Sequence, residues 1–191
     1  MRRCSPAEAR AILDIRRSRH LGIALLAVPS IDRIALPGEA SDPRFVEFFA
    51  YWRRCAPPGL LPGRQHIDPL DIPGLLPGIV LYDVVGDTAG DPAAVRFRFR
   101  LVGTMMCETL GVDPTGRFLD EFVLVDKQDT VHAAFVSIAR DRCVHYWENP
   151  LWSADRTYVR LQRLALPLAG DGKTVDMIAA YYIRTPTPAP A

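Results

Sequence analysis

The feature that most constrains the fold is an alternating run near the middle of the chain, VRFRFRLVGT at residues 95–104. Val95, Phe97, Phe99 and Leu101 share one parity, and three arginines occupy the other. Successive side chains of a β-strand point to opposite faces, so strict alternation predicts a strand with one buried and one solvated face. We expect a small sheet organised around this strand, with helices packed on one of its faces.

A second strand is predicted just before this one. Residues 79–85, IVLYDVV, are apolar on both parities except at Asp83, which is typical of a strand covered on both faces. Residues 86–92 are rich in Gly, Asp and Pro and predict the turn of a hairpin between the two strands. Strands joined by hairpins indicate an antiparallel sheet.

Three more strands are predicted in the last part of the chain, over residues 144–152, 158–168 and 174–184. In the middle one the apolar parity switches between Leu161 and Leu164, which predicts a bulge or strong twist near Arg163. In the last one we expect the odd-numbered residues to point inward, namely Val175, Met177, Ala179, Tyr181 and Ile183.

The helices are predicted by apolar spacing and capping residues. Ser41-Asp42-Pro43 marks the start of a helix over residues 43–54. This helix carries an apolar stripe at i, i+3, i+4 and i+7, formed by Phe45, Phe48, Phe49 and Trp52. This stripe favours a helix that packs across its own core, and a homodimer through the same helix is the alternative. Further helices are expected over residues 5–19, 104–110, 117–122 and from Asp126 to 141 or 142.

These elements predict one α+β domain with flanking segments. Residues 1–40 form a partly helical N-terminal extension. Residues 41–185 form the domain itself, in which helix 43–54 is followed by a proline-rich connector at 61–78 and a core at 79–185. Residues 186–191 belong to a proline-rich tail that we expect to be disordered.

Composition excludes several classes of partner. A formal net charge of +1 gives no field that would recruit nucleic acid or an anionic membrane. The four cysteines form no C-x-x-C pair, which is typical of reduced thiols in a cytoplasmic protein. The apolar run at residues 21–28 is far shorter than the roughly 20 residues that a membrane-spanning helix needs, and no small-x-small cleavage site follows it. We therefore expect a cytoplasmic protein.

Several short motifs follow one another in a recognisable order. They include Tyr51-Trp52-Arg53, Pro62-Gly63-Arg64, Ile67-Asp68-Pro69 and Leu75-Leu76-Pro77, then FRFRLVGT at 97–104, Gly111 and Thr115-Gly116-Arg117 followed by Leu119. In this order and spacing, residues 48–185 resemble a PAS domain, and more closely a family of compact bacterial proteins with a single PAS-like domain. The most specific part is R-L-V-G-T followed by G-x-D-x-T-G-R.

The resemblance implies a five-stranded antiparallel sheet in the order 2-1-5-4-3 with helices on one face. It also implies a sensory or regulatory function in signal transduction. We expect a standalone module that binds a small molecule or a signalling protein, has no catalysis of its own and can form a homodimer through helix 43–54. Fold alone does not fix the ligand.

Two PAS cofactors are disfavoured by particular residues. Flavin-binding PAS domains that form a thiol adduct carry an N-C-R-F-L-type motif, whereas here Gly116 stands in the cysteine position before Arg117-Phe118-Leu119. The nucleophile of that covalent step is therefore missing. Haem-binding PAS domains use an axial histidine, and His132 is the one histidine of the predicted long helix, on the flank of its apolar stripe. We predict no cofactor, with His132 as the weak candidate for a haem ligand.

Catalytic and metal sites receive little support from the sequence. His66 and Asp68 in the connector do not make a metal site, because the other histidines add no ligand spacing. No P-loop, G-x-G-x-x-G or serine elbow is present. The enzyme alternative is a small α+β cone-fold protein acting on an apolar small molecule, with Asp83 or His132 paired with Tyr146 in its cavity.

If the core holds a ligand cavity, we expect its wall to come from the short helices, the long helix and the inward residues of the last two strands. The candidate lining residues are Met105, Met106, Phe118, Phe135, Met177 and Tyr181. Methionine suits an adaptable pocket, and plain core packing explains the same residues. The third alternative is a filled core in a purely structural dimerisation or interaction domain.

Overall fold

The computed structural model describes residues 31–123, 125–150 and 159–186. The predicted helix at residues 5–19 and the predicted tail after residue 186 lie outside this part of the chain. Among the described residues, no helix is long and apolar enough to cross a membrane.

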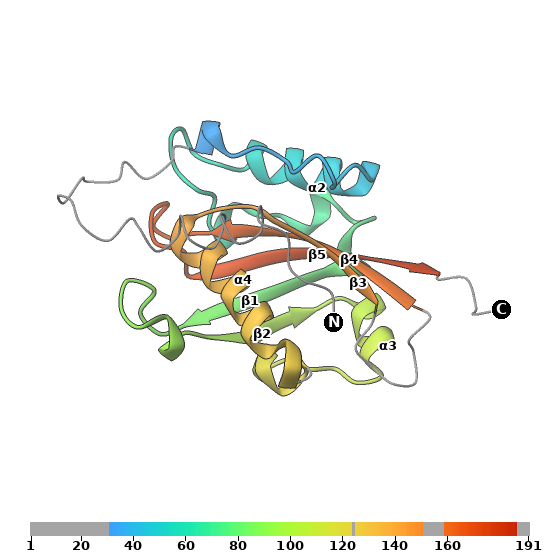
Figure 1. The fold of residues 1–191 in the computed structure, drawn as a ribbon. Helices are drawn as coiled ribbons and strands as arrows, with labels where there is room; N and C mark the ends of the chain where they lie inside the picture. Colours follow the sequence, from blue (N-terminus) through green and yellow to red (C-terminus); the bar gives the residue numbers. More distant parts are fainter. Residues whose placement is uncertain (1–30, 124, 151–158, 187–191) are drawn as a thin grey trace, which may run out of the picture.

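Five strands form one antiparallel sheet (Figure 1), and their bounds are β1 Ile79–Val85, β2 Arg96–Val102, β3 His145–Pro150, β4 Val159–Leu168 and β5 Met177–Pro186. Their order is β2-β1-β5-β4-β3, as predicted, and the α+β fold class is confirmed. The last strand in the sequence, β5, is therefore the central strand. It pairs with β1 on one side and β4 on the other.

Helices lie on both faces of this sheet (Figure 1). Helices α3, Thr104–Leu110, and α4, Gln128–Asp141, cover one face, which we call the inner face. There Phe135 of α4 packs edge-on against Tyr82 of β1, with ring centroids 4.9 Å apart. Short 3-10 turns at Leu119–Glu121 and Val125–Lys127 connect the two helices.

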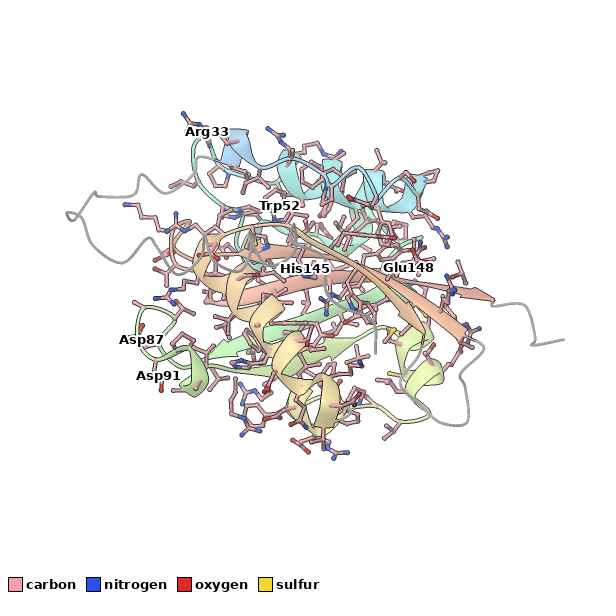
Figure 2. The ribbon with its side chains drawn as sticks, in the orientation of Figure 1. Arg33, Trp52, Asp87, Asp91, His145 and Glu148 are labelled. Carbon is pink, nitrogen blue, oxygen red and sulfur yellow. The ribbon has the colours of Figure 1, made fainter. Side chains whose placement is uncertain are left out.

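Helix α2, Pro43–Arg54, covers the opposite, outer face (Figure 1). Its Phe45 ring lies 5.8 Å from Tyr146 and 5.9 Å from Tyr181. Trp52 lies between α2 and the sheet (Figure 2). It donates its indole N–H to the carbonyl of Pro167 on β4 at 2.9 Å. The expectation of helices on one face holds for α3 and α4, whereas α2 makes the fold three-layered. The apolar stripe of α2 is buried within its own domain, and dimerisation through this helix stays a prediction.

The connector between α2 and β1 folds into three 3-10 turns, at Arg64–His66, Pro69–Asp71 and Leu76–Gly78. Asp68 caps the second turn by accepting a hydrogen bond from the Leu70 amide at 2.9 Å. The Tyr51 hydroxyl donates to the Asp68 carbonyl at 2.9 Å, which ties the connector to α2. Proline thus divides the connector into single turns.

The prediction of a bulge near Arg163 was wrong, and the irregular pairing lies in another part of the sheet. The pairing of β4 with β5 is continuous past Arg163, whereas the register between β1 and β2 shifts between Leu81 and Tyr82. The shift separates Phe99, which is 3% exposed, from Leu101, which is 44% exposed. Leu101 therefore lies opposite Leu81 rather than following Phe99 into the core.

Candidate functional site

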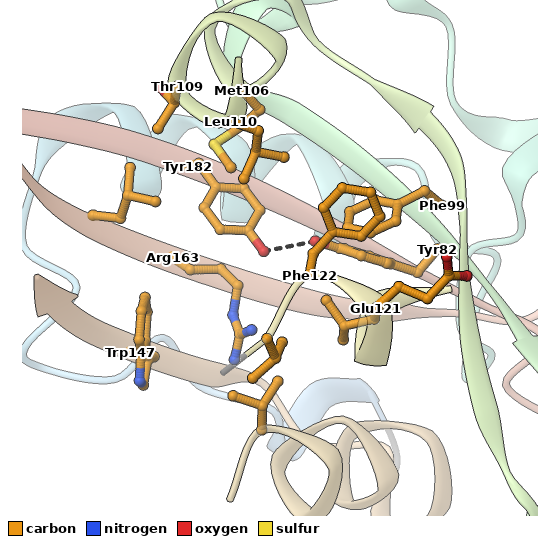
Figure 3. Close-up of a pocket in the computed structure, with 14 residues that line it drawn as sticks. Tyr82, Phe99, Met106, Thr109, Leu110, Glu121, Phe122, Trp147, Arg163 and Tyr182 are labelled. Atoms are coloured by element: carbon orange, nitrogen blue, oxygen red, sulfur yellow. Dashed lines mark hydrogen bonds between the residues drawn. The ribbon is translucent and has the colours of Figure 1, made fainter. Parts of the chain in front are cut away.

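The inner face of the sheet encloses a cavity of about 350 Å³ beneath α3 and the start of α4 (Figure 3). A volume of this size lies at the low end of the range for small-molecule sites, about 300–1,000 Å³. Every strand contributes to the wall, and the lining residues are Tyr82, Phe99, Met106, Thr109, Leu110, Leu119, Glu121, Phe122, Val123, Val131, Trp147, Leu161, Arg163 and Tyr182.

A row of three large side chains crosses the floor of the cavity. Strand pairing places Trp147 of β3 opposite Arg163 of β4, and Arg163 opposite Tyr182 of β5. Residues that face each other across neighbouring strands project to the same side of a sheet. All three therefore point to the inner face, where Figure 3 shows them side by side.

Arg163 is a charged group inside the core. The residue is 3% exposed, and its guanidinium carbon lies 4.5 Å from the ring centroid of Phe135 and 5.6 Å from that of Trp147. Its Nη2 lies 3.3 Å from Nδ1 of His145. The buried Nε has no hydrogen-bond partner, and no carboxylate forms an ion pair with this guanidinium among the described residues.

His145 is held neutral beside this arginine. Burial lowers the pKa of His145 from 6.5 to about 4, and the positive charge of Arg163 acts in the same direction. A neutral imidazole keeps an unprotonated nitrogen, which can accept a hydrogen bond from the guanidinium. Arg163 is thus supported by a neutral acceptor and two aromatic rings, which leave its charge uncompensated.

Two buried tyrosines stand next to Arg163. The hydroxyls of Tyr82 and Tyr182 are 2.7 Å apart and share a hydrogen bond (Figure 3). Burial, together with the Tyr182 hydroxyl, raises the pKa of Tyr82 well above its ordinary value, so its hydroxyl stays protonated. The pair carries two hydroxyl protons and uses one in the shared bond. The second proton has no recorded acceptor among the described residues, so it is available to a ligand.

The other polar groups of the wall are already engaged. Thr109 donates its hydroxyl to the carbonyl of Met105 at 2.7 Å. Glu121 accepts hydrogen bonds from the Phe118 amide at 2.9 Å and from Nε of Arg117 at 3.0 Å. These bonds lower the pKa of Glu121 and keep it ionised. Most of the remaining wall is apolar.

The structure places the predicted lining residues in different surroundings. Met106 lines the cavity, whereas Met105 packs against the core beside it. Phe135 lies behind the wall and supports Arg163 and Tyr82. The Phe118 ring lies under the guanidinium of Arg96, with the guanidinium carbon 3.6 Å from the ring centroid.

The prediction was wrong for the two candidate lining residues of the last strand, Met177 and Tyr181. Tyr181 faces α2 on the outer face, where its ring lies 5.7 Å from that of Phe48. Met177 has the same parity and does not line the cavity. The reason is the central position of β5, which buries both of its faces. An inward parity therefore does not identify the cavity face, and even-numbered Tyr182 occupies it.

The polar residues weighed for catalysis and haem are spread over separate places. His132 lines a second groove of about 310 Å³ beside β2, and its Nε2 lies 2.7 Å from the carbonyl of Val95. Asp83 pairs with Arg98 at 2.9 Å. Tyr146 lies on the outer face and donates its hydroxyl to Glu148 at 3.2 Å. The structure does not bring these three residues together.

Sequence reasoning missed Arg163, Tyr82 and Tyr182 as parts of a site. A signal for the first was present, because a charged residue interrupted an apolar strand at residue 163. The switch of apolar parity between Leu161 and Leu164 predicts a bulge or strong twist there instead. In a continuous strand the interruption marks a charge that points into the core.

Comparison with known families agrees with this geometry. A model of the PAS domain matches residues 41–182. The chain belongs to the PAS domain family. The resemblance seen in the sequence is therefore confirmed, and a PAS domain is typically a sensory module. No curated protein matches the chain.

Solved structures with a related arrangement share little sequence with this PAS domain. A domain of an HTR-like protein from Haloarcula marismortui is 16% identical, with 56% of this chain and 94% of that chain covered and a TM-score of 0.39. The Rhodobacter sphaeroides LOV protein is 11% identical, with 62% and 68% covered and a TM-score of 0.42. A sensory box histidine kinase/response regulator from Burkholderia thailandensis is 13% identical, with 61% and 82% covered and a TM-score of 0.38. All three scores are below 0.5, so the family assignment rests on the family model.

Proposed function

We propose that this PAS domain is a sensory or regulatory module that binds a small molecule in the inner-face cavity and has no catalysis of its own. The observation that carries the proposal is the cavity itself. It combines a mostly apolar wall with a few polar groups that converge on one side, which is the usual composition of a small-molecule site.

The chemistry of the wall suits binding better than reaction. Among the described residues, the lining side chains include no histidine, cysteine or serine, and the hydroxyl of Tyr82 stays protonated. A covalent or acid–base mechanism needs a nucleophile or base in contact with the ligand. The same wall offers no imidazole for haem and no thiol for a flavin adduct, so we propose a ligand other than these cofactors.

Native and denaturing mass spectrometry of the freshly purified full chain test this proposal, together with an absorption spectrum of the same sample. We expect a non-covalent mass that disappears on denaturation and no visible absorption band. A protein that carries no extra mass and binds nothing from a small-molecule screen would contradict ligand binding. A visible chromophore would contradict the proposed exclusion of haem and flavin.

A variant connects the bound mass to the cavity. Met106→Trp places an indole in the space that the ligand would occupy, because Met106 lines the cavity and is buried. We expect the retained mass to disappear while the circular dichroism spectrum stays unchanged. Leu70→Trp is the matched control, since Leu70 is exposed on the connector and should keep the ligand. Retention in both variants would place the ligand elsewhere.

A further inference from the structure

Arg163 differs from the arginines on the surface of the same domain. Arg96 pairs with Asp120, Arg98 with Asp83 and Arg117 with Glu121, each with a nitrogen–oxygen distance of 2.9 Å. These three side chains are half-exposed, where an ion pair contributes little to stability. Arg163 is buried and has no such carboxylate among the described residues.

This arrangement is opposite to what stability alone would favour. A charge taken out of water is strongly destabilising unless an opposite charge and good hydrogen bonds compensate it. The two aromatic rings and neutral His145 hold the guanidinium in place without neutralising it. Because Arg163 lines the cavity, a group that enters the cavity can supply the missing opposite charge.

We propose that the cavity binds a small organic monoanion, a carboxylate carried on an aliphatic or aromatic body, with the carboxylate on Arg163. This inference rests on the proposed ligand-binding function. It adds the chemical class of the ligand and the residue that selects it.

A carboxylate fits the donors that the cavity offers. A planar guanidinium presents neighbouring N–H groups at the spacing of the two carboxylate oxygens. The tyrosine pair formed by Tyr82 and Tyr182 has one further hydroxyl proton to donate. Arg163 lies directly opposite Tyr182 in the sheet, so both donors serve the same side of the cavity.

The rest of the wall determines what the carboxylate is attached to. The other side chains of the wall are largely apolar, and they include Leu110, Leu119, Phe122, Val123, Val131 and Leu161. An aliphatic or aromatic body is removed from water there, and the burial of its apolar surface favours binding. A purely polar anion would leave this surface without a partner.

A single negative charge suits the site better than two. Among the described residues, Arg163 is the one cationic side chain of the wall, and neutral His145 adds no charge. Glu121 also belongs to the wall and stays ionised through its bonds to Arg117 and Phe118. In Figure 3 its carboxylate points away from Arg163. A second anionic group on the ligand would meet this charge, which disfavours dicarboxylates and phosphate esters.

The test compares acids with their uncharged amides on the dialysed full chain. The probes are octanoate and octanamide, 3-phenylpropanoate and 3-phenylpropanamide, and indole-3-acetate and indole-3-acetamide, titrated by isothermal calorimetry. For the pairs that bind, we expect the acid to bind at least 10-fold more tightly than its amide. This comparison uses the wild-type protein and needs no variant.

Variants then assign the difference to Arg163. Arg163→Met should weaken acid binding at least 10-fold and leave amide binding within about 3-fold. Tyr182→Phe should weaken acid binding 3- to 10-fold. Arg98→Met is the matched control, because it removes an exposed arginine of the same sheet, and it should change neither.

The outcomes separate the two proposals. Amides that bind as tightly as acids, and lose binding in Met106→Trp, would overturn the monoanion inference and leave ligand binding intact. Acid binding that survives Arg163→Met would overturn the assignment to Arg163. If no probe binds, the mass released from the purified protein decides: a carboxylate supports the inference, and a neutral compound overturns it. Absence of both probe binding and a released mass would overturn both proposals.

Discussion

Replacement of Arg163 by methionine should stabilise the ligand-free protein. In the wild type the guanidinium is 3% exposed and its Nε lacks an acceptor. An unsatisfied buried donor costs about 1–3 kcal/mol, and removal of the charge from water costs several kcal/mol more. The hydrogen bond to His145 offsets about 1.5–3 kcal/mol of this cost, and each of the two contacts with aromatic rings offsets about 2 kcal/mol.

Methionine removes the charge and keeps a long flexible side chain in the same space. Its sulfur can contact the rings of Phe135 and Trp147, which contributes about 0.3–1.5 kcal/mol. We therefore expect Arg163→Met to raise the free energy of unfolding by about 1–2 kcal/mol. For a chain of 191 residues this raises Tm by about 2–8 °C.

The assay is urea unfolding followed by tryptophan fluorescence, with calorimetry as a second measurement. Native mass spectra must first show that the dialysed protein carries no ligand, because a bound acid stabilises the wild type by about 2.7 kcal/mol at 100 times its Kd. Arg98→Met is the control and should stay within about 0.5 kcal/mol of the wild type. The reasoning is refuted if Arg163→Met lowers the free energy of unfolding by about 1 kcal/mol or more, which is the size of a typical destabilising substitution. The guanidinium would then stabilise the fold itself.

Two further predictions concern the outer face and the half-buried histidine. Trp52→Ala removes a buried indole and its hydrogen bond to Pro167, so we expect a loss of about 3–5 kcal/mol in urea unfolding; an unchanged midpoint would show that α2 does not stabilise the sheet. His145 has a folded pKa of about 4 against an ordinary 6.5, so the unfolded chain binds a proton more readily as the pH falls. The contribution of neutral His145 to the free energy of unfolding is complete above pH 7 and is lost as the pH falls from about 6.5 to 4. Solvent screening of this half-buried group limits the loss of stability to about 1–2 kcal/mol. Unfolding at pH 7 and pH 5 of the wild type and His145→Gln measures it, and equal pH dependence of the two proteins would contradict the assignment.

Much of the fold could be predicted because its signals are local. The apolar stripe and the Asp42-Pro43 start define α2 as Pro43–Arg54, in agreement with the prediction. Alternation at residues 95–104 predicted β2, and the segment at 79–85, apolar except at Asp83, predicted β1 with the same bounds as the structure. Spacing and capping act between residues that are near in sequence, so a single chain reveals them.

The candidate site depended on which face of each strand meets which helix. Tyr181 and Tyr182 are adjacent and both buried, yet Tyr181 faces α2 and only Tyr182 lines the cavity. Periodicity cannot separate them, because β5 is the central strand and has apolar cover on both sides.

Arg163 shows most clearly which features follow from the local sequence and which depend on the tertiary structure. Its place in a strand and the break it makes in the apolar pattern were already present in the amino-acid order. That the strand stays regular there, and that the guanidinium lies between Trp147 and Tyr182 without a carboxylate among the described residues, depends on pairing with β3 and β5. Such pairings join residues far apart in the chain, so the element boundaries follow from local sequence, whereas the buried charge and its cavity exist only in the assembled sheet.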